Sequence, residues 1–283
     1  MTLDAAYYTQ GDAFQREKRT VFAQEWLPIA VREQLAQPGQ YVAASVGGWP
    51  MLAVCGTDGV TRAFRNTCRH KNMLLVEQDS GVCETFRCRF HGWTYDRAGA
   101  LCDAPPAVAP AGDRAQHGLV PMGLQAWQQV ILVNLQSPEP PADVGELDST
   151  CGVLVAACRH HAGMRMMDVA CNWKTLLESV LNDDAVIWRW PTLLLRAAGD
   201  ALWIDQIVPR TFLRTRVVRH VYVAAPGASG VAQPALTLLD VLKSQAEQLQ
   251  VERAQGKTAD ATPMHVAALH ARLANAYASD MPA

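Results

Sequence analysis

Two short segments of the chain each pair a cysteine with a histidine at a spacing suited to one metal centre. The first runs Cys68-Arg69-His70 and the second runs Cys88-Arg89-Phe90-His91, with residues 71–87 between them. Thiolate sulfur and imidazole nitrogen are both strong ligands for iron and for zinc. Such a set predicts either a [2Fe–2S] cluster, with the thiolates on one iron and the imidazoles on the other, or a structural zinc site.

The arrangement favours the iron–sulfur cluster over zinc. Zinc fingers usually take both cysteines from one element and both histidines from another, whereas each segment here supplies one of each. Both segments lie on expected β-hairpins, so a cysteine and a histidine can approach from each side. Gly92 directly follows His91 and lets the backbone turn amide groups toward the sulfur atoms. We therefore expect Cys68, His70, Cys88 and His91 to bind a [2Fe–2S] cluster.

The composition limits the class of protein. The chain has 283 residues, of which 49% are hydrophobic and 18% are charged, and its net charge is −2. A charge so near neutral gives no support for nucleic acid or an anionic membrane as partner. The N-terminus carries no signal-like segment, and no apolar stretch reaches the ~20 residues of a membrane span. Because the other cysteines are scattered, we expect a cytoplasmic protein.

The elements that must position the ligands fall into a helical start and a β-rich region. Residues 8–26 have apolar side chains at helical spacing, which predicts a helix. Its expected solvent face consists of Arg16, Glu17, Lys18 and Arg19. From Gln40 to about Leu135, short β-type runs alternate with glycine-containing turns, which predicts a compact antiparallel β domain. The expected strands are 41–46, 50–54, 60–64, 84–87, 93–96 and 129–135.

The remainder predicts a second domain that mixes helices and strands. Residues 137–141 are rich in proline and indicate a linker, and 144–161, with His160 and His161, are weakly helical. A strand at 164–170, a helix at 173–181 and strands at 201–208 and 211–224 follow. Two helices end the chain, the second with Thr262 as N-cap and Pro263 in its first position. The expected organisation is a framing segment 1–39, a β domain 40–136, a linker and helix 137–163, and a second domain 164–283.

The ligand segments resemble those of the Rieske family, specifically the α subunits of Rieske non-haem iron, or aromatic ring-hydroxylating, oxygenases. The matching stretches are 65–70 and 88–95, together with the N-terminal run from Tyr8 to Trp26. The resemblance implies that the two cysteines bind one iron and the two histidines the other. High-potential Rieske proteins carry two further cysteines where this chain has Met73 and Phe90. The resemblance therefore implies a low-potential, oxygenase-type cluster.

Two residues depart from the family pattern near the cluster. The family commonly has Arg-Gly after the first histidine, and this chain has Lys71-Asn72. Asparagine adopts a positive φ more readily than most residues, so we expect the loop to keep its shape. Arg89 stands where the family often has proline, and we expect this change to alter the surface more than the ligation.

The resemblance also extends into the second domain, which in that family is a helix-grip fold. There it holds one Fe(II) on two histidines and one carboxylate. Asn172-Trp173-Lys174 matches the landmark that precedes the ligands, but no histidine occurs between His161 and His220. Read without a gap, Ala185 and Trp190 occupy the two ligand positions; alternatively, residues 190–195 match a later segment and the ligands are deleted. Both alignments predict an α+β fold class in which a shortened helix-grip (START-like) domain binds no mononuclear Fe(II).

Several polar residues remain as candidates for other roles. Glu247 is a weak candidate for a third iron ligand, although a surface carboxylate on an amphipathic helix is the commoner case. His220 on a predicted strand could rebuild an iron site if carboxylates converged on it. Asp183 and Asp184 are the remaining candidates for an acidic bridge that carries electrons between subunits, because a carboxylate can hold a cluster histidine.

The resemblance implies a function, and three readings of it stay open. In the first, the chain is an electron-transfer subunit of a heteromeric, trimer-based oxygenase. It would receive electrons from a reductase or ferredoxin and pass them to the mononuclear iron of a partner α subunit. In the second, it is a self-sufficient hydroxylase or demethylase with a rebuilt iron site. In the third, it is a structural or regulatory pseudo-subunit.

Overall fold

The computed structural model describes residues 3–136, 151–153, 155–226, 232–257 and 263–279. Contacts divide the chain into two compact units, one formed by Trp26–Pro141 and the other by Met1–Glu25 together with Ala142–Ala283. The second unit is therefore discontinuous in sequence, because its first helices come from the N-terminus. Within the described ranges, no helix is long and apolar enough to cross a membrane.

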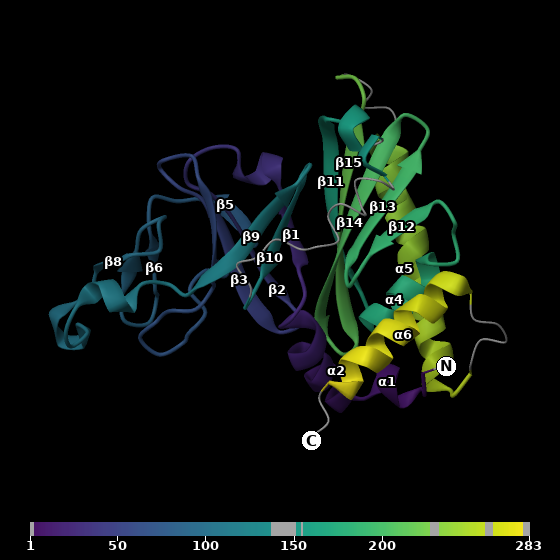
Figure 1. Cartoon of the computed structure of the whole chain (residues 1–283), viewed down its shortest axis with the longest axis horizontal. Coiled ribbons are helices and arrows are strands. Elements are labelled where there is room, and N and C mark those ends of the chain that lie inside the picture. The colour runs from purple at the N-terminus through teal and green to yellow at the C-terminus, as the bar shows by residue number, and fades with distance from the viewer. Residues whose placement is uncertain (1–2, 137–150, 154, 227–231, 258–262, 280–283) are drawn as a thin grey trace. The chain divides into compact units, whose positions relative to one another are not determined.

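The unit of residues 26–141 is built from antiparallel strands (Figure 1). Its larger sheet has the strand order β1-β10-β9-β4-β3-β2-β5. These strands are β1 (Leu27–Val31), β2 (Gln40–Val46), β3 (Trp49–Cys55), β4 (Thr61–Arg65), β5 (Ser80–Val82), β9 (Pro121–Trp127) and β10 (Val130–Asn134). A smaller sheet contains β6 (Phe86–Arg87), β7 (Thr94–Tyr95) and β8 (Leu101–Asp103). Short 3-10 turns occur at Arg32–Leu35, Pro106–Val108 and Arg114–His117.

One hydrophobic core joins these two sheets. Leu52 of β3 and Phe86 of β6 belong to the same buried cluster, which also contains Cys68 and Cys88. The two cysteines thus lie where the sheets meet, at the base of the two ligand loops. Burial of apolar side chains from both sheets fixes the loops to each other, since a close-packed interior tolerates little displacement.

The start of this unit differs from the expected division of the chain. The sequence placed residues 1–39 in a framing segment, but β1 pairs antiparallel with β10, with Leu27 opposite Val133. All five residues of β1 are buried, so the alternation that marks a half-exposed strand is missing. The structure accordingly places the boundary at Trp26 and not at Gln40. The structure also contains the short strand β5, which was not among the expected strands and whose three residues are all exposed.

The other unit packs helices against a five-stranded antiparallel sheet of order β11-β15-β14-β13-β12. Its strands are β11 (His160–Val169), β12 (Val186–Arg189), β13 (Leu193–Ala198), β14 (Ala201–Thr211) and β15 (Arg214–Val223). Its helices are α1 (Ala6–Thr9), α2 (Gly11–Glu17), a π-helical turn (Lys18–Phe22), α4 (Trp173–Val180), α5 (Ala232–Ala254) and α6 (Met264–Ala278). Figure 1 shows α5 lying along one face of this sheet, with α4 and α6 near one end of it.

Helix α5 packs on the sheet through one side. Its buried residues recur every three or four positions, as helix geometry requires for a single buried face. They include Ala235, Leu239, Leu242, Ala246, Gln250 and Arg253. Ala235 shares a hydrophobic cluster with Trp203 of β14 and Val221 of β15. Because side chains alternate along a strand, Arg219 and Val221 face α5, and His220 faces the opposite side of the sheet.

Two expectations for this unit are wrong. Glu17 was placed on a solvent-exposed helix face, but its side chain is completely buried and accepts hydrogen bonds from Trp173 and Lys174. His160 and His161 were placed on a helix, but they lie at the start of β11. Tertiary hydrogen-bond partners and strand pairing across the chain decide these positions, and neither is visible in local sequence periodicity.

Other expectations differ by their bounds or lie outside the described residues. Strands β12 and β13 were not among the expected strands. Pro263 precedes the first residue of α6 and adopts an extended conformation. The linker 137–141, residues 144–150 and 154 of the weak helix 144–161, and Thr262 lie outside the residues that the structure describes; residues 151–153 and 155–157 of that predicted helix are helical.

Candidate metal centre

The two ligand loops have the same backbone hydrogen bonds. In each loop the cysteine carbonyl accepts from the amide four residues later, and the cysteine amide donates to the carbonyl five residues later. The four N···O distances are 2.8 Å for Asn72 to Cys68 and for Cys68 to Met73, 2.9 Å for Gly92 to Cys88, and 2.8 Å for Cys88 to Trp93. The residue that closes each turn has a positive φ, 54° at Asn72 and 73° at Gly92. The expectation that asparagine would preserve the first loop is confirmed.

These loops bring together all four side chains predicted as ligands. Cys68 and Cys88 are both buried and neither forms a disulfide. The ring centroids of His70 and His91 lie 4.6 Å apart. His70 Nδ1 is buried and has no hydrogen-bond partner, which is costly for a polar atom unless something binds it. Two thiols, two imidazoles and an unsatisfied ring nitrogen fit a [2Fe–2S] cluster.

Tyr95 and Trp93 of the second loop hold the first loop in place. The Tyr95 hydroxyl accepts the amide hydrogen of Arg69 at 2.9 Å and lies 3.3 Å from Cys68 Sγ. Because its oxygen accepts from Arg69, its own hydrogen is available for the sulfur. The Trp93 ring stacks on His70 at a centroid distance of 5.1 Å. Tyr95 therefore fixes the sulfur and Trp93 fixes the orientation of the imidazole.

Burial sets the protonation preferences of these groups. It raises the pKa of the Cys68 thiol, so an uncompensated thiolate is disfavoured there. Desolvation, together with the charges of His91 and Lys71, lowers the pKa of His70 and favours its neutral, metal-binding form. The pKa of Tyr95 is raised by burial, which keeps its hydroxyl protonated as a donor.

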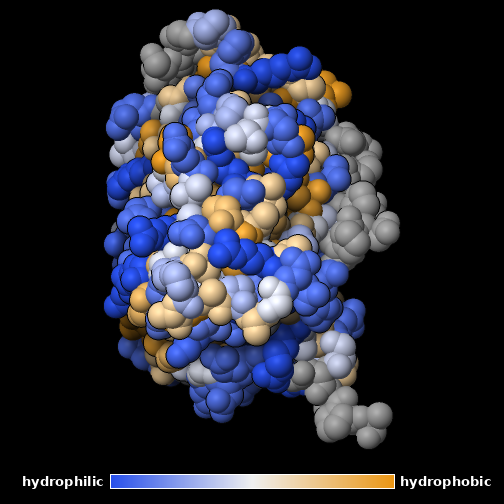
Figure 2. Space-filling view, turned by 90° about the vertical axis from the view of Figure 1, so that its left-hand side faces the viewer, coloured by the Kyte–Doolittle hydropathy of each residue, from blue (hydrophilic) through white to orange (hydrophobic). Residues whose placement is uncertain are grey.

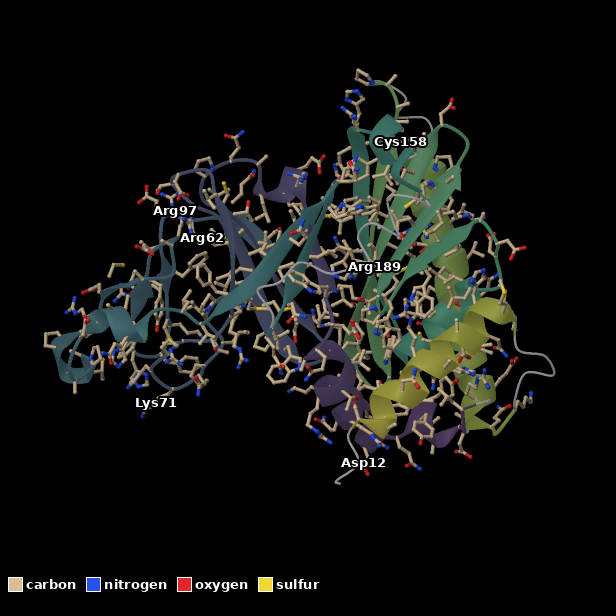
Figure 3. All side chains as sticks on the ribbon, in the orientation of Figure 1. Asp12, Arg62, Lys71, Arg97, Cys158 and Arg189 are labelled. Carbon is tan, nitrogen blue, oxygen red and sulfur yellow. The ribbon has the colours of Figure 1, made fainter. Side chains whose placement is uncertain are left out.

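The outer surface of the loops is both cationic and apolar. Arg69, Lys71 and Arg89 are exposed, and so are parts of Met73 and Phe90. Arg89 pairs with Glu77 at 2.6 Å and contacts the Phe90 ring, so the residue found in place of proline acts at the surface. Figure 3 shows Lys71 extending outward from its loop. Figure 2, which faces the side where β6 and β8 lie, shows hydrophobic residues interspersed among hydrophilic ones.

The segment Asn172-Trp173-Lys174 begins α4 in the other unit. The Asn172 side chain caps the helix by accepting the Lys174 amide hydrogen at 3.0 Å. Lys174 Nζ donates to Glu17 at 2.6 Å, and both side chains are fully buried. The Trp173 indole and the Tyr277 hydroxyl also donate to Glu17. This motif therefore joins α2, α4 and α6 through one buried carboxylate.

A second buried carboxylate lies one turn further along α4. Glu178 Oε1 accepts from the Tyr8 hydroxyl at 2.5 Å and lies 2.8 Å from His270 Nε2. Its Oε2 accepts from Arg253 of α5 at 2.6 Å. Burial alone would raise the pKa of Glu178, but His270, Tyr8 and Arg253 outweigh it, and the pKa lies below its ordinary value. The carboxylate is thus ionised and fully used for packing the helices.

The two positions aligned with iron histidines hold no metal ligand. Ala185 is exposed, whereas the Trp190 ring is buried against Trp173 and Trp188, at centroid distances of 6.1 and 5.9 Å. Across the described residues, no three His, Cys, Asp or Glu side chains are close enough to hold a single metal ion. The cluster ligands are consistent with this result, because each iron of the cluster would bind only two protein side chains: two cysteines on one iron and two histidines on the other.

The other candidates have separate structural environments. Glu247 accepts the amide hydrogen of Ala170, at the end of β11. The Nδ1 atom of His220 lies 3.2 Å from His161 Nε2, and within the described residues no carboxylates converge on it. Asp183 pairs with Arg196 at 2.7 Å, and Asp184 is exposed. The structure brings none of these residues together.

A cavity of about 390 Å³ lies within this unit, bounded by the end of α4, the strands β12 to β15 and the first half of α5. Two carboxylates line it, and an arginine pairs with each of them. Arg219 binds Asp205 through two bonds of 2.7 and 2.5 Å, and Arg196 binds Asp183. Its lining includes no histidine, cysteine or glutamate.

Residues 25–128 match the protein family described as the Rieske [2Fe–2S] domain. The chain contains a Rieske domain, and such a domain implies a [2Fe–2S] cluster. The chain is also homologous to oxygenase α subunits. It is 30% identical over 188 residues to the chlorobenzene dioxygenase subunit alpha of Cupriavidus sp. (strain PS12), a match that covers 64% of this chain and 42% of that relative. It is 25% identical over 192 residues to the carnitine monooxygenase oxygenase subunit of Acinetobacter baumannii, covering 64% and 50%.

Solved structures with the same fold cover more of the chain. The quaternary ammonium Rieske monooxygenase CntA in complex with γ-butyrobetaine superimposes with a TM-score of 0.80 at 18% identity, over 98% of this chain and 95% of that one. Naphthalene 1,2-dioxygenase with indole bound gives a TM-score of 0.67 at 16% identity, over 91% and 82%. The predicted α+β fold, an antiparallel Rieske domain followed by a helix-and-sheet domain, is confirmed.

Sequence reasoning missed the residues that support the ligands. Tyr95 and Trp93 were noted only as parts of a motif, although both contact the first loop. Glu17 was read as a surface residue, and Glu178 was given no role. The lysine and tryptophan at the start of α4, next to Leu176 and Leu177, were the available signals, because such groups need polar partners when buried.

Proposed function

We propose that this chain is the electron-transfer subunit of a heteromeric Rieske oxygenase. Its [2Fe–2S] cluster, held by Cys68, His70, Cys88 and His91, accepts electrons from a reductase or ferredoxin. The electrons then pass to the mononuclear iron of a partner α subunit. The homology to oxygenase α subunits supports the general class, and the two points below support the specific role.

The cluster residues are arranged for binding and for electron exchange. Both sulfur atoms are buried in the hydrophobic core, whereas the two imidazoles belong to partly exposed loop residues. The cluster, when bound, supplies one-electron chemistry. The Tyr95 hydroxyl is placed to donate to Cys68 Sγ, and such hydrogen bonds tune a cluster's potential. Trp93 keeps the His70 ring in one orientation at the surface.

One observation carries the proposal that the iron of the reaction belongs to another subunit. The cavity between α4, α5 and the sheet holds only two carboxylates, Asp183 and Asp205, and an arginine neutralises each. Non-haem Fe(II) oxygenases need two histidines and a carboxylate with open positions. In the part of the chain that the structure describes, neither the cavity nor α4 supplies an imidazole to such a site.

The test is to count the metals and measure turnover of the purified chain. We expect about two irons and two acid-labile sulfides per chain, reduction of the cluster by dithionite, and no third iron after anaerobic addition of Fe(II). Adding an iron-bearing α subunit should allow O₂-dependent turnover that consumes electrons from the cluster. A third tightly bound iron with O₂-dependent turnover by the chain alone would overturn the proposal.

A substitution separates electron transfer from a purely structural role. Tyr95→Phe removes the hydroxyl near Cys68 Sγ but keeps the ring, so the cluster should assemble. We expect the reduction potential to fall and the rate of electron transfer to the partner to change with it. The deciding comparison is a variant without the cluster, such as Cys68→Ser. If the partner subunit keeps its full activity with that variant, the chain is a structural subunit and the electron-transfer role is refuted.

A further inference from the structure

The cavity of the helix-and-sheet unit has apolar walls that the described residues leave partly exposed. Val180 and Val186 line it from α4 and β12, and Leu238, Val241 and Leu242 line it from α5. The side chains of Leu238 and Val241 are 46% and 51% exposed. When a ligand covers apolar side chains that are partly exposed to water, the removal of their surface from water favours binding. At about 390 Å³, the cavity is within the range of small-molecule sites.

The charged groups of the cavity differ in how many of their hydrogen-bonding atoms already have partners within the protein. Asp205 accepts two bonds from Arg219, whose remaining side-chain nitrogen donates to the Ala235 carbonyl. This pair is buried, with 7% and 9% of the side chains exposed. It therefore neutralises itself and offers little to a ligand.

Arg196 has donors to spare. A guanidinium carries five N–H donors, and Asp183 is the one ion-pair partner of Arg196 among the residues that the structure describes. Both side chains of this pair are about 40% exposed, at 41% and 39%. The Asp183 carboxylate, by contrast, also accepts the Ala185 amide hydrogen at 2.9 Å. The cavity thus has unused donors and satisfied acceptors.

Trp203 places the guanidinium of Arg196 in the cavity wall. The Arg196 guanidinium carbon lies 5.3 Å from the centre of the Trp203 ring, and both residues line the cavity. Stacking on an aromatic ring restricts a long side chain and so lowers the entropy that binding would otherwise cost. An arginine held in this way is suited to bind a carboxylate through two parallel hydrogen bonds.

We propose that this cavity is a binding site for a small carboxylic acid with an apolar body, with the carboxylate on Arg196 and the body against Leu238, Val241 and Leu242. A cationic ligand fits less well, because both carboxylates in the cavity already have partners. The ligand stays chemically unchanged, since the cavity supplies no set of metal-binding side chains. This inference goes beyond the electron-transfer role and does not depend on it.

Calorimetry with the full, cluster-containing chain tests the site. The probes are 3-phenylpropanoate, the neutral 3-phenylpropanol, the cationic 3-phenylpropylamine, and acetate, which lacks the apolar body. We expect the aromatic acid to bind at least about tenfold more tightly than the alcohol, because charge-assisted hydrogen bonds exceed neutral ones. The amine and acetate should bind most weakly. Equal binding of acid and alcohol, or no binding of the acid, would overturn the proposal.

Two variants locate the binding, and a third serves as control. Arg196→Gln should weaken the acid about tenfold and leave the alcohol unchanged, while Val241→Glu, at an exposed position, should weaken both. Arg216→Gln removes a partly exposed arginine that pairs with Asp168 outside the cavity lining, and should affect neither. Near-UV circular dichroism confirms that each variant is folded. If folded Arg196→Gln binds the acid as tightly as the parent chain does, the proposed site is refuted. If the acid is recovered chemically modified after the cluster has been reduced in air, the proposal that the ligand stays unchanged is refuted.

Discussion

The two ligand loops and helix α4 both match a known oxygenase motif, but they use their polar side chains in opposite ways. In the loops, the two cysteines form no disulfide, and the buried Nδ1 atom of His70 has no hydrogen-bond partner among the described residues. Along α4, Lys174 and Glu178 are as deeply buried, yet each is held by charged or hydroxyl-bearing side chains from other helices. The first arrangement leaves polar atoms available to a cofactor, whereas the second uses its polar atoms in contacts within the protein.

The difference lies in what the polar atoms of each motif contact. Without a metal, the buried polar atoms of the loops stay unpaired, and burying unpaired polar atoms costs free energy. The residues of α4 also connect α2, α5 and α6, so they stabilise the fold whether or not iron is bound nearby. Matching a motif therefore identifies the fold, and the partners of its polar atoms indicate whether the site can still bind a metal.

The largest expected effect is on the loops. Cys68→Ser should abolish the cluster, because a serine hydroxyl is a poor substitute for a thiolate on iron. We expect iron content to fall from about two per chain to near zero, with loss of the visible absorption. Cys102→Ser is the matched control, since Cys102 is exposed on β8, and should keep its iron. Full iron content in Cys68→Ser would show that the loops do not form the metal centre.

On the side of α4, breaking a pair should destabilise the chain without affecting iron. Lys174→Met leaves the Glu17 carboxylate buried without its cation, and removing one partner of a buried pair costs about 3–5 kcal/mol. The matched control is Arg216→Met at the more exposed pair with Asp168, where about 0–1 kcal/mol is expected. Urea unfolding measures both. A similar small loss in the two variants would mean that the buried pair contributes no more than a surface pair.

His220 of β15 has a buried Nε2 atom without a hydrogen-bond partner among the described residues. Burial, with a smaller effect of His161, lowers the pKa of His220 to about 3. The unfolded chain then binds the extra proton below about pH 6.5. The contribution of neutral His220 to the free energy of unfolding is therefore fully present above about pH 6.5. It is lost as the pH falls toward 3, by at most about 1.4 kcal/mol per pH unit.

Urea unfolding at several pH values measures this loss in the parent chain and in His220→Gln. The substitution should remove the His220 contribution and make the profile flatter between about pH 6.5 and 3. His160→Gln, an exposed side chain of β11, should retain the parent slope. If His220→Gln unfolds with the parent pH dependence, the imidazole is not held neutral in the folded chain.

The smallest effect concerns the shape of the first loop. Asn72 has a φ of 54°, a conformation that alanine adopts at a cost of about 1 kcal/mol. Asn72→Ala should lower stability by about that amount, while Asn72→Gly should not destabilise the loop. Thermal unfolding of cluster-loaded protein distinguishes them. Equal stability of the alanine and glycine variants would show that the left-handed turn does not constrain this position.

Much of the Rieske unit could be predicted because its information is local. The Cys-x-His and Cys-x-x-His spacings, the glycine after His91 and the short alternating strands each specify their own surroundings. Strands β1, β5, β8 and β9 were not among the expected strands. Of these, β1 and β5 lack alternation, one being wholly buried and the other wholly exposed. Periodicity cannot detect a strand whose two faces are alike.

The sequence alone predicted which atoms could bind a cluster and showed that no histidine occurs between His161 and His220, since both depend only on residue type and order. The tertiary structure decided what those atoms contact. It placed Glu17 beside Lys174, a residue far along the chain, and it paired Asp183 with Arg196 in a cavity wall. Burial and pairing depend on contacts between distant segments, and these contacts set the charge and the binding capacity of each group.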